Sequence, residues 1–532
     1  MDKNENEGLK GNGRSQVMRA AGLVGSLVLV SRLVGLLRDI ITKYYLGADS
    51  LEANAFATAN RFPETIFLVI AGGAIGSAFI PIFSAYFSEE NEAAGWRLFS
   101  AIINLLTIVS TIVAVITAVF APNIVTLFIG AKISAEPELL PLTVKLMRIM
   151  LISPVIFGVS GVFMGALNAR QHFLLPALAP IVYNLGIIVG VILIKPPVIG
   201  LAVGTVIGAL GHLLIQIPGL RQKGAKYTAV FTLNDPDVQQ VLRLMAPRVL
   251  GLSFSQINKF ISLSIIGASA LIDSSLVAND TALMLIIMPQ GVLGQALGIA
   301  AFPTLATLAA QSAYDEMRQI ITDSLRIMLF LGLPITVAFV LLRTPLISFV
   351  FERGAFTADS TRVAAWALLF YAFGLIPLIF IEVLARSFYA LSDTLTPVLT
   401  GGVQILFMGG LSYWFSRFLF PSLDWLPVGG IALAFSLSNV LEIGLLLWLL
   451  RRKMRRLNGR SLLDASWRMG FGAMAMGLVM WGVLGLMETA VSWLQLILGG
   501  LVGTVVYLTT SFLLQVTELQ QFIEFGRRRL SR

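Results

Sequence analysis

Charged residues interrupt the first apolar stretch of the chain, at a depth where a membrane-spanning helix is normally apolar. They are Arg32, Arg38, Asp39 and Lys43. Charged side chains inside a bilayer are costly and usually face a cavity or a partner. A guanidinium suits phosphate, because its planar fork donates two hydrogen bonds at once. The stretch therefore predicts an electropositive cavity that holds an anionic headgroup, and Gly35 gives the helix a place to bend.

Polar residues recur at similar depth in two later apolar stretches. Arg61 lies in the second stretch, and Gln256, Asn258 and Lys259 lie in the seventh. For residues near predicted helix ends, such as Arg61 and Lys43, snorkelling to the membrane surface is the alternative interpretation. The predicted substrate-binding set is Arg32, Arg38, Asp39, Arg61, Gln256, Asn258 and Lys259.

One acidic residue lies deep in the stretch 362–385. Glu382 is followed four residues later by Arg386. Residues at this spacing share a helix face, so a buried ion pair is one interpretation. A coupling-ion or proton site at Glu382 is the other.

Several kinds of chemistry are excluded by residue content. The chain has no cysteine and only two histidines, His172 and His212. Disulfides, iron–sulfur clusters and thiol nucleophiles are therefore excluded, and a histidine-based metal site has too few ligands. No HExxH, GxxxxGK[ST] or serine-elbow motif is present. We predict no enzyme activity, no metal and no cofactor, with coupling to a monovalent cation or to the membrane potential left open.

The composition indicates a membrane protein. Of the 532 residues, 57% are apolar and 13% are charged, and the mean hydropathy is +0.85. Soluble domains carry about 45–50% apolar and about 25% charged residues. We therefore predict an all-α polytopic membrane protein with about 14 transmembrane helices of about 20 residues each. The windows lie near 20–46, 55–83, 98–121, 140–167, 174–194, 198–218, 242–267, 281–306, 324–342, 362–385, 395–415, 428–450, 467–487 and 493–515.

Lysine and arginine gather in alternate loops, and this asymmetry predicts the orientation. Basic loops stay cytoplasmic, so both termini are expected in the cytoplasm, and the net charge of +9 needs no nucleic acid to explain it. The expected segments are a polar cytoplasmic N-terminus (1–19), a first lobe (20–220), a second lobe (221–450), a basic cytoplasmic loop (451–466), an accessory helix pair (467–515) and a basic tail (516–532).

The two halves of the chain resemble each other at a nearly fixed offset of about 220 residues. The run Ala166–Pro176 matches Phe388–Pro397, and Asp39 and Lys259 are repeat mates. Six helices per repeat return the chain to the same side of the membrane. The repeats are therefore predicted to be two parallel lobes around a central cavity, related by an axis along the membrane normal.

Ordered motifs spread across most of the chain. Besides the charged first stretch they are Gly165–Arg170 with Pro176–Pro180, Pro289–Val292, Phe351–Thr357 and Phe388–Pro397. In this combination the chain resembles the MurJ/MviN lipid II flippases, within the multidrug/oligosaccharidyl-lipid/polysaccharide flippase superfamily. The resemblance implies a fold of fourteen helices. It also implies translocation of lipid II, the undecaprenyl-diphosphate-linked peptidoglycan precursor, to the outer leaflet of the bacterial cytoplasmic membrane by alternating access.

The resemblance also implies site residues and partners. It assigns Arg32, Arg38 and Asp39 to the cavity that handles the diphosphate and sugar headgroup. Membrane lipids, and cell-wall synthases in transient contact, are the expected partners. The chain departs from relatives that carry arginines where Phe67 or Leu68 and Met284 stand here, which leaves the lipid-linked substrate open.

Three alternatives to lipid II transport remain. A flippase for another polyprenyl-diphosphate-linked oligosaccharide, such as O-antigen or exopolysaccharide lipid, fits the missing arginines. A cation-coupled exporter of amphiphilic cations needs an acidic cavity, whereas the first stretch is net basic. A membrane scaffold that transports nothing does not need charges inside its helices.

Overall fold

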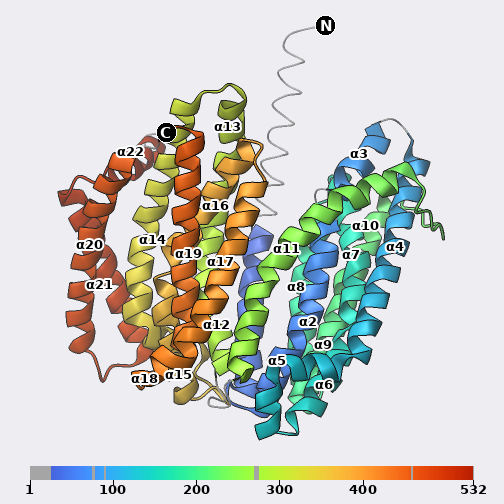
Figure 1. The fold of residues 1–532 in the computed structure, drawn as a ribbon, viewed down its shortest axis with the longest axis horizontal. Coiled ribbons are helices and arrows are strands. Elements are labelled where there is room, and N and C mark those ends of the chain that lie inside the picture. Colours follow the sequence, from blue (N-terminus) through green and yellow to red (C-terminus); the bar gives the residue numbers. More distant parts are fainter. Residues whose placement is uncertain (1–25, 75–77, 89–90, 269–274, 457–458, 531–532) are drawn as a thin grey trace. The chain divides into compact units, whose positions relative to one another are not determined.

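A computed structural model describes residues 26–74, 78–88, 91–268, 275–456 and 459–530 (Figure 1). Within these ranges the secondary structure is helical and includes no strand, which confirms the all-α prediction. The predicted N-terminal segment 1–19 and the first residues of the predicted span 20–46 lie outside the described residues. The chain divides into two compact units, residues 1–273 and 274–532.

The described residues of the first unit form a helix over residues 26–46 and ten further helices. They are α2 (Leu51–Ala74), α3 (Ile80–Ser88), α4 (Glu92–Val119), α5 (Ala121–Ala135), α6 (Leu139–Met150), α7 (Ile152–Ala169), α8 (Leu174–Leu193), α9 (Pro197–Leu214), α10 (Ile217–Gln222) and α11 (Pro236–Ala268). Helix α2 packs against α6, α7 and α11. A core of buried aromatic and aliphatic side chains joins α3, α4 and α7, with Phe83, Trp96 and Phe99 at its centre.

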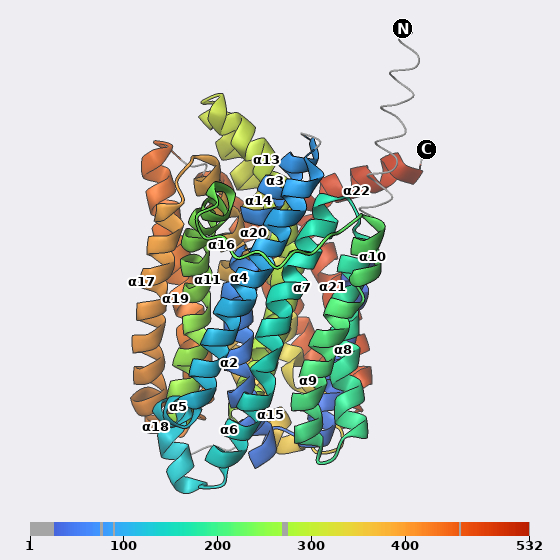
Figure 2. The same cartoon turned by 90° about the vertical axis from the view of Figure 1, so that its right-hand side faces the viewer.

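Glycines bring α8 and α9 into close contact, and the two helices run side by side in Figure 2. A Cβ atom at Gly190 would lie 2.4 Å from the carbonyl oxygen of Gly200, and one at Gly186 would lie 2.4 Å from the Cα atom of Gly208. No side chain fits at these positions. Small residues let helix backbones approach closely in a membrane, where apolar side chains gain little from leaving lipid.

The second unit follows with a similar set of helices. They are α12 (Ser275–Pro289), η2 (Gln290–Gln295), α13 (Ala296–Ala310), α14 (Tyr314–Phe351), α15 (Ala358–Ala372), α16 (Leu375–Ala390), α17 (Leu395–Trp414), η3 (Phe415–Leu419), α18 (Phe420–Ser422), α19 (Val428–Lys453), α20 (Gly459–Gly485), α21 (Ser492–Leu513) and α22 (Thr517–Leu530). Helices α20 and α21, the predicted accessory pair, pack against each other and against α14.

Ten helices among the described residues are long and apolar enough to cross a membrane, and α15 with α16, bent by 47°, makes an eleventh. These eleven segments coincide with eleven of the fourteen predicted windows. The remaining windows correspond to helix 26–46, α2 and α11, which carry the charged candidates and are not among the eleven. The polytopic helical architecture is confirmed, and the number fourteen stays a prediction.

Two details differ from the sequence expectation. Residues 121–135 form the short apolar helix α5, where no window was predicted. Its 15 residues are too few to span about 30 Å of hydrocarbon. Helix α11 packs against α2 and α5 in the first unit, although the sequence assigned it to the second lobe. Packing units and repeat-based lobes are different divisions, so the lobe boundary at 220 stays a prediction.

The internal repeat has a local counterpart in helix geometry. Helices α8 and α17 both have 20 residues and begin 221 positions apart. Just before them, Gln171 (φ 55°) and Ser392 (φ 59°) are the left-handed residues that end α7 and α16. The same pair of backbone hydrogen bonds closes both turns. Shared conformation at equivalent positions supports the offset seen in the sequence.

Candidate functional site

Arg38 joins the first helix to α8. Its Nε and Nη2 atoms donate to Asp39 Oδ1 at 3.1 and 2.8 Å, and its Nη1 atom donates to Asn184 Oδ1 at 3.0 Å. Gly35 lies one turn earlier on the same face, where an added Cβ atom would be 3.7 Å from Asn184 Nδ2. The guanidinium, with 29% of the side chain exposed, is therefore held but remains accessible.

Lys259 joins α11 to α2 in a second ion pair. Its Nζ atom lies 2.7 Å from Glu64 Oε1, and the two side chains are 33% and 41% exposed. Arg61, which is buried, donates from Nη1 to the backbone carbonyl of Lys259 at 3.2 Å. Arg61 of α2 and Lys259 of α11 therefore lie together beside the turn of α2 that carries Glu64.

The two ion pairs of the first unit lie close enough for their charges to interact. Glu64 and Tyr183 lie close enough to Arg38 to interact with its charge. The structure thus brings together Arg38, Asp39, Arg61 and Lys259 of the predicted set. It pairs each repeat mate separately, Asp39 with Arg38 and Lys259 with Glu64. Charges of both signs alternate here, so the site offers both donors and acceptors.

The other predicted residues have different surroundings. Arg32 is exposed and has no hydrogen-bond or ion-pair partner among the described residues. Gln256 is buried. Asn258 is half-buried, and its Oδ1 atom has no hydrogen-bond partner in the described part of the chain. Gly35 lies within an unbroken helical segment, and its role as a hinge stays a prediction.

Glu382 in the second unit forms the ion pair with Arg386 that their spacing predicted. Gln290 Nε2 also donates to Glu382 Oε1 at 2.7 Å, from the start of η2. A cavity of about 370 Å³ opens beside this cluster. Gly298 lies against Arg386, because a Cβ atom added there would be 2.8 Å from Arg386 Nη1, so a larger residue would displace the guanidinium. The ion-pair interpretation is confirmed, and an ion-coupling role for Glu382 stays a prediction.

Several polar contacts escaped the sequence analysis. Glu64, Asn184 and Gln290 are absent from the predicted site, because their partners lie 92 to 195 residues away in the sequence. His212 is buried near the end of α9, where its Nδ1 atom lies 2.6 Å from Ser160 Oγ. The one sequence signal for these contacts is that polar residues occur inside apolar stretches.

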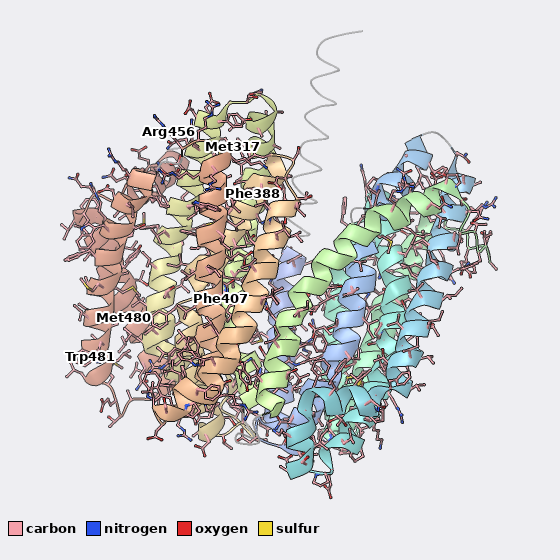
Figure 3. All side chains as sticks on the ribbon, in the orientation of Figure 1. Met317, Phe388, Phe407, Arg456, Met480 and Trp481 are labelled. Atoms are coloured by element: carbon pink, nitrogen blue, oxygen red, sulfur yellow. The ribbon has the colours of Figure 1, made fainter. Side chains whose placement is uncertain are left out.

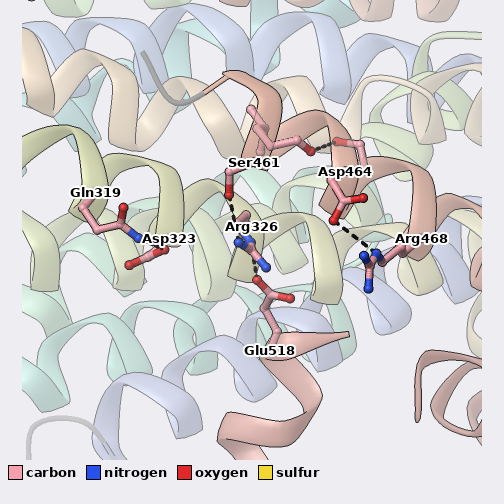
Figure 4. A network of polar contacts seen from close by, with 9 residues as sticks. Gln319, Asp323, Arg326, Ser461, Asp464, Arg468 and Glu518 are labelled. Atoms are coloured by element: carbon pink, nitrogen blue, oxygen red, sulfur yellow. Dashed lines mark hydrogen bonds and ion pairs between the residues drawn. The ribbon is translucent and has the colours of Figure 1, made fainter. Parts of the chain in front are cut away.

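A further network fastens the accessory helices (Figure 4). Arg326 of α14 lies 2.5 Å from Glu518 of α22, and its Nη1 atom donates to Ser461 of α20 at 3.0 Å. Asp464 and Arg468 form an exposed pair along α20 at 3.1 Å. These contacts tie three helices together and are structural. Among the described residues no cluster of three or more metal-ligating side chains occurs.

Comparison with known proteins gives one consistent family. Residues 42–501 match the family model described as lipid II flippase MurJ. The lipid II flippase MurJ of Burkholderia cenocepacia is 29% identical over 72% of this chain and 75% of its own. The probable lipid II flippase MurJ of Vibrio cholerae is 27% identical over 81% and 82%.

Solved structures agree on the fold. A lipid II flippase MurJ structure in an inward closed conformation matches 96% of this chain and 100% of its own, at 24% identity and a TM-score of 0.75. An inward-facing multidrug resistance transporter of the MATE family in the MOP superfamily covers 82% of this chain and 98% of its own, at 16% identity and a TM-score of 0.65. With the family model matching most of its length, the chain belongs to the lipid II flippase MurJ family.

Proposed function

We propose that this protein translocates lipid II from the inner to the outer leaflet of the bacterial cytoplasmic membrane. Family membership supports the substrate and the location. The structural observation that carries the proposal is the set of charged contacts between helix 26–46, α2, α8 and α11. Such groups inside a membrane protein usually serve a substrate path. The protein is a transporter, and no catalytic step is assigned to it.

The lipid headgroup binds when its phosphates replace the carboxylates that Arg38 and Lys259 contact in the structure. A diphosphate offers oxygen acceptors that match the planar fork of Arg38 and the ammonium of Lys259. Both side chains are about one-third exposed, so an entering headgroup can compete with Asp39 and Glu64. The displaced carboxylates accept hydrogen bonds from sugar hydroxyls. Arg32, exposed and without a partner among the described residues, supplies an early contact.

The proposed architecture is fourteen spans, in two parallel six-helix lobes around a central cavity with an accessory pair at the end. It adds helix 26–46, α2 and α11 to the eleven apolar spans. Basic loops on one side favour cytoplasmic termini. The lobes alternate access by rocking, with Gly35 bending the first helix. Glu382 is the candidate for coupling to a monovalent cation or to the membrane potential, and cell-wall synthases are the candidate transient partners.

A second candidate function is transport of another polyprenyl-diphosphate-linked oligosaccharide. The observation that favours it is at Phe67, near the position where the family resemblance implies an arginine. Phe67 packs on Phe157 with ring centroids 4.5 Å apart, so this part of α2 offers aromatic contact in place of a cation. A cation-coupled exporter of amphiphiles is less well supported, because the cluster is not acidic.

The test is replacement of a host's own flippase. Cells depleted of that protein and expressing this chain should survive, and labelled lipid II should become accessible in the outer leaflet. Survival should be lost with an Arg38→Ala variant that still inserts at wild-type level. Normal insertion without any outward lipid II would overturn the proposal. Restored O-antigen transport in a strain that lacks its own O-antigen flippase would favour the second candidate.

A further inference from the structure

A polar cavity in the second unit has no role in the proposed transport cycle. It has a volume of about 710 Å³. Three connections line it: the end of α14 with the start of α15, the turn before α19, and the segment between α20 and α21. All three contribute charged or hydroxyl-bearing side chains, so the cavity differs from a gap between lipid-facing helices.

This cavity opens at the end of the unit opposite its basic segment. Leu426 lines the cavity just before α19 begins at Val428. Helix α19 then runs for 26 residues, about 39 Å at 1.5 Å per residue, to the basic run 451–453. In Figure 3, Arg456 and Trp481 mark opposite ends of the unit. Because basic loops stay cytoplasmic, the cavity faces the outer side of the membrane.

The motif Phe351–Thr357 places Glu352 in the lining of the cavity. Phe351 and Phe356 are buried against each other, with ring centroids 6.1 Å apart. Gly354 adopts a left-handed conformation (φ 60°), which glycine takes without a steric penalty. The hydroxyl of Thr361 donates to Glu352 Oε2 at 2.8 Å. The turn therefore fixes the carboxylate of Glu352 at the rim.

Helix α15 turns one face toward the cavity. The lining residues of α15 are Ala358, Thr361, Arg362, Ala365 and Trp366. Their spacing of three and four positions marks a single helical face. The small side chains on this face leave space for a ligand, and Arg362 and Trp366 provide groups that can contact it.

Charged groups in the cavity do not satisfy one another. Arg343 donates to the backbone carbonyl of Val340, and no ion pair of Arg343 occurs among the described residues. Asp424 and Glu488 likewise have no ion-pair partner in the part of the chain that the structure describes. Polar groups that line a pocket without partners of their own are available to a ligand.

Two tryptophans complete the lining. The rings of Trp366 and Trp425 meet edge to face, with centroids 5.4 Å apart and an interplanar angle of 81°. The indole N–H of Trp366 donates to the Leu426 carbonyl at 3.2 Å, which fixes that ring. Trp425 is 43% exposed. Such amphipathic rings give a ligand a large, rigid contact surface.

We propose that this cavity is a saccharide-binding site on the outer face of the protein. Indole rings pack against the apolar face of a pyranose ring, while Asp424 and Glu488 accept hydrogen bonds from its hydroxyls. Arg343 donates to an acyl carbonyl or a carboxylate, and Arg362 does so in exchange for its exposed partner Asp359, which lies 3.3 Å away. The lining fits one or two N-acylated sugar rings, and this choice of sugar rests on the proposed function, whose substrate carries such a headgroup. The volume lies in the range of small-ligand sites, and it is too small for a folded partner. The site consists of other residues than the charged cluster of the first unit and requires no transport.

Binding by the purified full-length protein in nanodiscs tests this proposal. The probe is the soluble disaccharide N-acetylglucosaminyl-N-acetylmuramic acid, measured by calorimetry and tryptophan fluorescence. We expect saturable binding to the wild type and none to Trp425→Ala. Asp424→Asn, which keeps a residue type that tolerates the left-handed conformation (φ 55°) of this position, should bind about tenfold more weakly, as expected for a lost charge-assisted hydrogen bond. Glu488→Gln should behave in the same way.

Controls separate this site from general effects. Trp481→Ala removes an exposed tryptophan of α20 outside the cavity, and Asp464→Asn removes an exposed carboxylate near the start of the same helix. Both should bind like the wild type. Absence of binding to the wild type, or equal binding by all variants, would overturn the proposal. A muramyl-free peptide that binds as well as the disaccharide would also overturn it, in favour of a peptide site. Each outcome is independent of lipid II transport.

Discussion

The two units hold their intramembrane charges in different ways. In the first unit Arg38 pairs with its neighbour Asp39, but it also reaches Asn184, 146 positions away, and Lys259 pairs with Glu64, 195 positions away. In the second unit the deep carboxylate of Glu382 pairs with Arg386 on the same helix, and among the described residues Gln290 reaches it from another element. The contacts of Arg326 with Glu518 and Ser461 also join different helices of this unit, but they fasten the accessory helices. A pair within one helix survives movement of that helix, whereas a pair between helices breaks when they separate. Helix movement and partner exchange are therefore linked in the first unit.

Replacement of Arg38 should have the largest effect. Arg38→Ala removes three charge-assisted hydrogen bonds at once, and each is worth about 1.5–3 kcal/mol. We expect lipid II translocation to fall by about 100-fold or more, since about 1.4 kcal/mol corresponds to tenfold. Arg38→Lys keeps the charge but loses the planar fork, and should retain part of the activity. Outer-leaflet labelling of lipid II measures both.

The matched control is Arg148→Ala, which removes an exposed arginine of α6 that donates to a backbone carbonyl. It should transport normally. If Arg38→Ala inserts, keeps its thermal stability and still transports like this control, the hypothesis that Arg38 exchanges its protein partners for the diphosphate is wrong. If Arg38→Lys transports as well as the wild type, a point charge is sufficient and the bidentate geometry has no role.

Reversal of the Lys259–Glu64 pair tests the link between helices. Lys259→Glu and Glu64→Lys each place like charges at a contact of 2.7 Å, so each should lower both thermal stability and transport. The double variant restores opposite charges and should recover the stability, by about 0.5–1 kcal/mol for a partly exposed pair. Transport should recover less, because the cation then lies on α2 instead of α11.

Thermal unfolding in detergent and lipid II labelling give the two readouts. A double variant no more stable than either single variant would mean that the pair does not fasten α2 to α11. Full recovery of transport would mean that the cation serves equally well on α2 and on α11. Either result would remove the distinction drawn between the two units.

Much of this organisation could be predicted from the sequence. Apolar length alone located eleven spans, because burial in lipid leaves a continuous signal along the chain. Charges inside apolar stretches marked Arg38, Asp39 and Lys259, which do contact polar partners. The expected ion pair of Glu382 followed from a spacing of four residues, because that partner lies on the same helix.

Partners on other helices could not be predicted. Asn184 is one polar residue in an apolar helix, and nothing local indicates that its Oδ1 atom meets Arg38, 146 positions earlier. Arg32 and Arg38 look alike in sequence, yet only Arg38 contacts a described partner. Side-chain contacts between helices depend on helix rotation and crossing, which hydropathy does not determine. The cavity lined by Trp366 and Trp425 arises from three loops for the same reason.

Neutralisation of Glu382 should have a smaller effect. Glu382→Gln keeps a side chain of the same shape but removes the ion pair, which for neighbours on one helix is worth about 0.3–0.5 kcal/mol. Stability should change little. If Glu382 couples a cation, lipid II transport by the variant should lose its response to an imposed cation gradient, with a several-fold drop in the driven rate. Asp464→Asn, which removes another described pair at this spacing, is the control. An unchanged gradient response in Glu382→Gln would contradict the coupling role.

The smallest effect is expected at the connection between α16 and α17, outside the membrane-spanning segments. Partial burial raises the pKa of the Asp393 carboxyl, but hydrogen bonds from Lys453 and Thr396 outweigh burial and lower this pKa from 3.8 to about 2. A carboxyl whose pKa is lower in the folded state stabilises the fold above its unfolded pKa. That stabilisation is lost as the pH falls from about 4 to about 2. Asp393→Asn should therefore lower the unfolding temperature slightly at pH 7, and the difference from the wild type should lose most of its size as the pH falls to about 2. An undiminished difference at pH 2 would mean that the contact with Lys453 does not depend on the carboxylate charge.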